Sequence, residues 1–124
     1  MRAAAQGSGD RVVFEFEGPV PGYRIGYADG PIVQDGSGDA VAVSGAAALQ
    51  VRFNPASSVE LTGGLRKTYT GPTRSTPPGM QKITEVVQVS DFEAYLVWAV
   101  GTRSKTPFSV SVLSAPSRVV IDFP

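Results

Sequence analysis

Residues 11–16 read Arg-Val-Val-Phe-Glu-Phe, and residues 118–123 read Arg-Val-Val-Ile-Asp-Phe. Both hexads place apolar side chains at every second position, the spacing that puts them on one face of a β-strand. In both, an arginine, a valine and an acid share the other face. We predict a pseudo-symmetric pair of strands at the two ends of the fold. A chance match between two short strands of a β-rich chain is the alternative.

The same alternation recurs between the two hexads. Apolar side chains at every second position predict strands over residues 23–27, 47–54, 83–90, 93–100 and 108–112, with a turn at 91–92. The chain also contains 14 glycines and 10 prolines, which favour many turns, and no segment has the period of a long amphipathic helix. The sequence therefore predicts an all-β fold, an antiparallel β-sandwich of about eight or nine strands.

The composition excludes several classes of function. The 124 residues include no histidine and no cysteine, which removes serine-histidine and cysteine-histidine catalysis, the usual zinc ligands and any disulfide framework. Eleven basic residues balance eleven acidic ones, so no overall field favours nucleic acid or a membrane surface. The composition argues against most enzymes, and we expect no metal, no cofactor and no nucleic-acid partner.

The length is that of one domain, and we expect a monomer. Residues 1–9 contain one charge and no apolar stretch, so they are predicted to be a disordered lead-in or an expression remnant before a single domain at 10–124. No part of this chain has the apolar segment of a signal peptide. No apolar run approaches the roughly 20 residues that cross a bilayer.

The neutral total hides two opposed blocks of charge. Residues 10–60 contain seven acids and three bases, whereas residues 61–84 contain no acid. The basic segment contains Arg66, Lys67, Arg74 and Lys82, together with Tyr69. Guanidinium groups match carboxylates and phosphates, so this segment is a candidate polyanion site. The alternative is a solvated loop that happens to be basic.

Three further patterns have both a functional and a structural interpretation. Residues 35–39, Asp-Gly-Ser-Gly-Asp, could contact calcium, but they lack the remaining oxygen ligands of a calcium loop, which favours a turn. Glu85, Asp91 and Glu93 could serve glycoside cleavage, but acids at opposite pleat positions seldom converge. The potential sugar-stacking groups are Tyr23, Tyr27, Tyr69, Tyr95 and Trp98. Trp98 shares a face with apolar neighbours, which favours a place in the core.

Several ordered segments together resemble one known family. They are residues 10–16, 21–24 with Tyr27, 69–72 (Tyr-Thr-Gly-Pro), 84–87, 91–93, 96–101 and 116–122. In this order they resemble the AMIN-like domain of secreted proteins and lipoproteins from high-GC Gram-positive bacteria. The resemblance runs from about residue 10 to the end of the chain. It departs at residues 6–9, where the family often has a histidine.

The resemblance implies a β-sandwich of two related sheets, an exported location, and a non-catalytic role in the cell envelope. The AMIN domain, to which the family is similar, is thought to bind peptidoglycan. The polar family positions carried over are Asp10, Arg11, Tyr27, Asp91, Glu93, Arg118 and Asp122. Their alternative role is structural, since acids and bases at strand starts can pair with each other.

Together these observations predict a non-catalytic module that contacts peptidoglycan or another anionic wall polymer. The candidate ligand-binding residues are Arg66, Lys67, Tyr69, Arg74, Lys82, Arg11, Arg118 and Tyr27. The alternative is a protein-interaction domain of an exported protein that docks an envelope partner along a sheet edge. A carbohydrate-active enzyme using the acids at 85, 91 or 93 is the weakest hypothesis.

Overall fold

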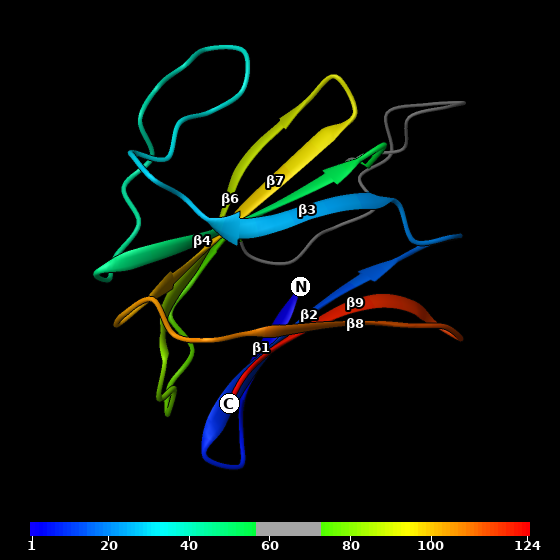
Figure 1. Cartoon of the computed structure of the whole chain (residues 1–124). Helices are drawn as coiled ribbons and strands as arrows, with labels where there is room; N and C mark the ends of the chain where they lie inside the picture. The colour runs from blue at the N-terminus through cyan, green and yellow to red at the C-terminus, as the bar shows by residue number, and fades with distance from the viewer. Residues whose placement is uncertain (57–72) are drawn as a thin grey trace.

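The computed structural model describes residues 1–56 and 73–124, and their nine strands form two antiparallel sheets packed as a sandwich (Figure 1). Sheet A contains β1 (Arg2–Gln6), β2 (Gly9–Phe16), β9 (Ser117–Phe123) and β8 (Ser109–Leu113), in that spatial order. Sheet B contains β3 (Gly22–Tyr27), β4 (Ala47–Asn54), β7 (Tyr95–Thr102), β6 (Ile83–Phe92) and β5 (Arg74–Ser75). The predicted all-β sandwich is confirmed.

The two hexads lie side by side at the centre of sheet A, as strands β2 and β9. Their facing pairs are Arg11 with Asp122, Val13 with Val120, and Glu15 with Arg118. The first position of each hexad therefore faces the fifth of the other, and the third faces the third. A local pseudo-twofold axis passes between Val13 and Val120, and the β1-β2 and β8-β9 hairpins flank it. The predicted pseudo-symmetric pair of strands is confirmed.

The prediction of a disordered lead-in over residues 1–9 is wrong. Strand β1 pairs with β2 over five positions, from Arg2 opposite Val13 to Gln6 opposite Gly9. Three consecutive alanines have weak β-propensity and no alternation, so only the free edge of β2 specifies this strand. Gly9 is required at the hairpin because a Cβ there would clash with the backbone of Phe123.

The main core lies between the sheets and is built from alternate residues of the long strands. Its members on these strands include Val12, Phe14, Leu49, Val51, Phe53, Ile83, Val86, Leu96, Trp98, Val100, Val119, Ile121 and Phe123. The ring of Phe14 on sheet A contacts Phe53 at 5.2 Å and Trp98 at 5.6 Å between centroids. Trp98 is buried, as predicted from the face it shares with apolar neighbours.

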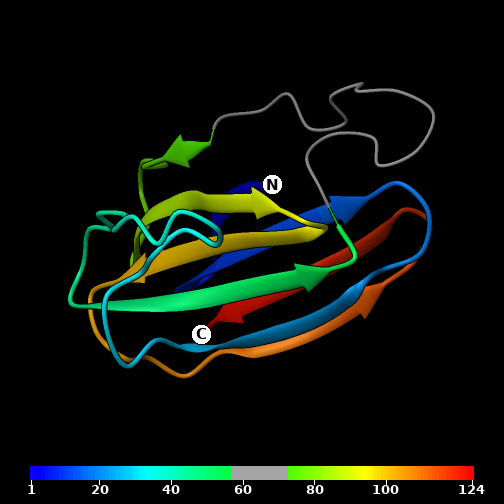
Figure 2. The same ribbon diagram turned by 90° about the horizontal axis from the view of Figure 1, so that it is seen from above.

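A long connection, residues 28–46, covers part of the outer face of sheet B, over β6 and β7, and we call it the strap. Its Ile32 packs with Val89, Val97 and Ala99 in a second apolar cluster. In Figure 2 the strap is the cyan segment beside the ends of β6 and β7. Strand β7 is therefore buried on both faces, which explains its nearly continuous apolar sequence.

Strand β6 departs from simple alternation. Two register shifts, between Ile83 and Glu85 and between Gln88 and Ser90, change which side chains face the core. The strand also continues to Phe92, so the hairpin turn is at Glu93 and Ala94, whose φ angles are 50° and 66°. The predicted turn at 91–92 is therefore wrong by two residues. Glu93 and Ala94 are not residue types that usually adopt positive φ in a turn, so the sequence did not indicate that the chain reverses there.

Candidate functional site

The most distinctive surface feature lies on sheet B, where β3, β4 and β7 meet. Arg24 of β3 and Arg52 of β4 are directly opposed in the ladder. Their neighbours Ile25 and Val51 pack toward the core, so both arginines project from the outer face. A shallow depression of about 440 Å³ is lined by Gly22, Tyr23, Arg24, Arg52, Asn54 and Tyr95. We call it the Arg24 depression.

The guanidinium group of Arg52 is held from two sides. Its Nη1 and Nη2 donate to the two carboxylate oxygens of Asp35 at 2.8 and 3.3 Å. Its Cζ also lies 5.5 Å from the ring centroid of Tyr95, a cation-π distance. Because Asp35 belongs to the strap, this contact also fastens the strap to the edge of the depression. The orientation of Arg52 is thus fixed before any ligand arrives.

Arg24 has a different environment. Its side chain is exposed and forms no hydrogen bond or ion pair with the part of the chain that the structure describes. Like charges directly opposite each other across a ladder are destabilising, and Asp35 neutralises only one of the two arginines. Among residues 1–56 and 73–124, the depression therefore has one uncompensated positive charge beside an oriented guanidinium group.

Two tyrosines border the depression. Tyr23 retains 45% of its accessible surface and Tyr95 retains 41%. An exposed tyrosine offers a flat apolar face together with a polar hydroxyl group, a combination common at binding surfaces. Tyr95 lies on the outer face beside Arg52, whereas Tyr23 is opposed to the core residue Phe53, so its ring lies on the inner side of β3. The outer lining thus combines the exposed ring of Tyr95 with guanidinium donors.

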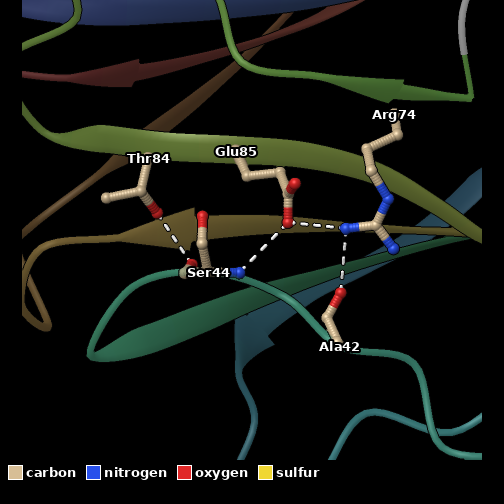
Figure 3. Close-up of polar contacts among 5 residues, drawn as sticks. All are labelled: Ala42, Ser44, Arg74, Thr84 and Glu85. Atoms are coloured by element: carbon tan, nitrogen blue, oxygen red, sulfur yellow. Dashed lines mark hydrogen bonds and ion pairs between the residues drawn. The ribbon is translucent and has the colours of Figure 1, made fainter.

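The other end of the strap is fastened by a polar network around Glu85 (Figure 3). The nearly buried Glu85 Oε1 accepts from the backbone N–H of Ser44 at 3.1 Å and from Arg74 Nη1 at 2.8 Å. Arg74 also donates to the Ala42 carbonyl at 3.0 Å, and Thr84 Oγ1 donates to the Ser44 carbonyl at 2.7 Å. Arg74, a predicted ligand-binding residue, therefore has a structural role here.

Two other predicted ligand-binding residues, both on sheet A, have partners within the fold. Arg11 donates to both carboxylate oxygens of Asp122, at 2.6 and 3.3 Å, and this hydrogen bonding, followed by the charge of Asp122, raises the pKa of Arg11. Arg118 donates to the carbonyls of Ser114 and Pro116.

Tyr27 is engaged at the side of the sandwich. Its hydroxyl donates to the Thr106 carbonyl at 2.7 Å, and its ring packs edge-on against Phe108. Tyr27, Arg11, Arg118 and Arg74 therefore lie in three separate places and do not form one site.

The remaining members of the predicted basic segment are only partly described. Lys82 is half-buried, and its backbone N–H donates to Asp10 at 2.6 Å. Arg66, Lys67 and Tyr69 lie outside the described residues.

The carboxylates considered for catalysis do not converge. Glu85 is bound to Arg74 near the start of β6, whereas Asp91 and Glu93 lie at its far end and in the following turn. For calcium, Asp35 already gives both oxygens to Arg52. The segment 35–39 is a turn, closed by Ser37 Oγ donating to Gln34 Oε1 at 3.0 Å.

Sequence reasoning missed Arg24 and Arg52 as site residues. Their opposition depends on the β3-β4 register, which is set across the intervening strap. The sequence feature that could have indicated this site was its aromatic residues, because Tyr23 and Tyr95 were both potential sugar-stacking groups. Each sits at the end of a strand, where a large ring remains partly exposed.

A model of the AMIN-like domain family matches residues 1–124. The chain belongs to the AMIN-like domain family. This family points to a cell-wall-associated binding module, and its members are generally non-catalytic. Comparison of this AMIN-like domain with curated proteins and with solved structures finds no match. Among residues 1–56 and 73–124 of the AMIN-like domain, no helix is long and apolar enough to cross a membrane.

Proposed function

We propose that this AMIN-like domain is an exported, non-catalytic module that binds an anionic polymer of the cell wall, with peptidoglycan as the first candidate. The observation that carries the proposal is Arg24, which has no charged partner among the described residues, beside the oriented Arg52 and the exposed ring of Tyr95. Family membership supports the wall as the location of the ligand.

The charge distribution favours local binding over general polyanion attraction. The chain has a formal net charge of zero, so its overall field does not attract an anionic polymer. A repeating polymer can still be retained by a weak site, because many equivalent groups on one strand raise the effective concentration. A shallow, preformed depression suits this weak and repeated contact.

The basic segment remains a second contact within this proposal. Arg66, Lys67 and Tyr69, together with the nearby Lys82, supply positive charge and one aromatic ring in the sequence. Arg11, Arg118 and Tyr27 contribute less, because each is engaged within the fold.

Sedimentation with purified wall sacculi tests the proposal. The isolated domain is mixed with sacculi at low and moderate salt, with insoluble cellulose as the neutral-glycan control. We expect retention on sacculi that falls as salt rises, because exposed charges are screened within about 10 Å at 0.1 M. Absence of retention at both salt concentrations would overturn the proposal.

A second candidate function is docking of an envelope protein along an edge of sheet A. Strand β8 is one of the two edge strands of this sheet, and its Val112 and Leu113 keep 49% and 42% of their surface exposed. Exposed apolar side chains beside unpaired backbone groups suit addition of a strand from a partner. Cross-linking in cells separates the two functions, because a protein partner stays attached after enzymatic digestion of the wall, whereas wall binding does not.

A further inference from the structure

We infer that the Arg24 depression binds a single saccharide unit bearing one negative charge, whose acidic group is shared by Arg24 and Arg52 while its ring packs on Tyr95. This inference rests on the proposed function and names the part of the polymer that is recognised. It is carried by the charge, the geometry and the aromatic lining of the depression.

The charge balance selects a monoanion. Arg24 and Arg52 contribute two positive charges, and Asp35 supplies one negative charge to Arg52. Counting the described residues, one positive charge remains, which one carboxylate or one phosphodiester neutralises. A phosphate monoester, with a charge of about −1.5 to −2 at neutral pH, would leave an excess beside the Asp35 carboxylate.

The geometry suits an acidic group with two oxygens. Directly opposed residues in an antiparallel pair have Cβ atoms about 4.5–5.5 Å apart, so the two guanidinium groups can approach one anion together. Arg52 is already oriented by Asp35 and Tyr95, which reduces the entropy lost on binding. Arg24 has no hydrogen bond or ion pair with a described residue and can close over the anion from β3.

The aromatic lining selects a sugar ring over a flexible polyol chain. Tyr95 keeps 41% of its surface exposed despite its contact with Arg52, and Tyr23 borders the same depression. The C–H face of a pyranose ring is apolar and rigid, so packing it on tyrosine removes apolar surface from water with little loss of conformational freedom. A polyol phosphate chain would lose more freedom for the same contact.

The like-charged pair is distinctive within the described ladders. Charged residues opposed across β2 and β9 have opposite signs, as in Arg11 with Asp122. Arg24 with Arg52 is the like-charged cross-strand pair among the described residues. A bound anion would convert this destabilising pair into a favourable three-charge arrangement.

Soluble probes test the inference directly. Backbone amide shifts of the domain are followed by NMR during titration with N-acetylmuramic acid, which bears one carboxylate, and with N-acetylglucosamine, its uncharged counterpart. We expect millimolar binding of the acidic sugar, with shifts centred on residues 22–24, 52–54 and 95. The neutral sugar is expected to bind about tenfold or more weakly. A glycerol phosphodiester is the third probe, because it carries the same charge without a pyranose ring.

Matched variants locate the site. Arg24→Gln is expected to weaken binding of the acidic sugar about tenfold, whereas Lys105→Gln, an equal loss of charge beyond the other end of β7, leaves it unchanged. Tyr95→Phe keeps the ring and is expected to keep binding, whereas Tyr95→Ala loses it. Urea denaturation of each variant confirms that the fold is intact.

The outcomes separate this inference from the proposed function. If sacculi retain the wild type and Arg24→Gln equally, and the acidic sugar moves no amide in the depression, the inference is wrong while wall binding stands. If the phosphodiester binds more tightly than the acidic sugar, the saccharide assignment is overturned. If sacculi fail to retain the domain but the acidic sugar binds at the depression, the subsite stands and the wall polymer is not its source.

Discussion

The outer faces of the two sheets arrange cross-strand charges in opposite ways. On sheet A the pseudo-twofold axis sets Arg11 against Asp122 and Glu15 against Arg118, so each facing pair has opposite signs. The first pair is bonded through two hydrogen bonds, while Glu15 accepts from Arg2 of the neighbouring β1 at 3.1 Å. This face neutralises its own charges.

On sheet B the facing pair is Arg24 with Arg52, and the only carboxylate that the described residues bring to it, Asp35, comes from the strap. Opposite charges that face each other across two strands can thus stabilise the fold, whereas the facing arginines of sheet B are balanced only in part by the described residues. Exposed pairs of the first kind contribute at most about 1 kcal/mol each. The second kind persists at a small cost in stability.

The largest expected effect is that of removing the buried carboxylate of Asp10 on β2. Its control is the partly exposed carboxylate of Asp122 on the neighbouring β9. Asp10, only 1% exposed, accepts hydrogen bonds from three successive backbone N–H groups, those of Gln81, Lys82 and Ile83. Asp10→Ala leaves all three donors without this partner, so we expect the free energy of unfolding to fall by about 3 kcal/mol. Urea denaturation followed by tryptophan fluorescence measures it.

Asp122→Ala is the matched control, because it removes an aspartate from the partly exposed outer face of the same sheet. Its effect is expected to be a small fraction of that of Asp10→Ala. Equal losses from the two substitutions would contradict the distinction between inner and outer carboxylates.

A middle-sized effect is expected where the strap is fastened to sheet B. Glu85→Ala removes the acceptor for Ser44 N–H and the partner of Arg74, and we expect a loss of about 2 kcal/mol in unfolding free energy. Glu85→Gln keeps an acceptor and should lose less. Faster amide hydrogen exchange in residues 40–46 of Glu85→Ala would locate the effect in the strap; unchanged exchange there would contradict this role.

The smallest effect sharpens the comparison by making sheet B resemble sheet A. Arg24→Glu turns the like-charged pair into an opposite-charged pair, so we expect a gain of roughly 0.5 kcal/mol in unfolding free energy. The same variant should lose binding of the acidic sugar, because its carboxylate repels the anion. Thermal denaturation and NMR titration measure the two effects. Lower stability of Arg24→Glu than of the wild type would contradict the expectation that repulsion between Arg24 and Arg52 destabilises the fold.

Much of the fold follows from local patterns in the sequence. The two hexads each specify a strand with one apolar face, and the alternation over 47–54 matches β4 closely. The β6-β7 turn was less predictable, because Asp91 suggested a turn while the chain reverses at Glu93 and Ala94. Residues with little turn preference can reverse the chain when the flanking strands are strongly paired.

The candidate site was less predictable than the fold. The local excess of basic residues predicted a ligand site in residues 61–84. Arg74 from that segment, however, is bound to Glu85. Arg24 and Arg52 lie in the acidic block, where a count of charges hides them. Linear charge density does not show which side chains the fold leaves without a partner.

Local sequence patterns specify the described strands other than β1 and β5, the inner and outer faces of most of them, and the repeated hexads, because strand formation depends on alternation over a few neighbouring residues. Only the tertiary structure decided that the hexads pair about a pseudo-twofold axis, that the strap buries the outer face of β7, and that Arg24 meets Arg52 beside Tyr95. These features depend on the register between strands far apart in the chain. That register is set by packing of the whole core, so it cannot be read from any one segment.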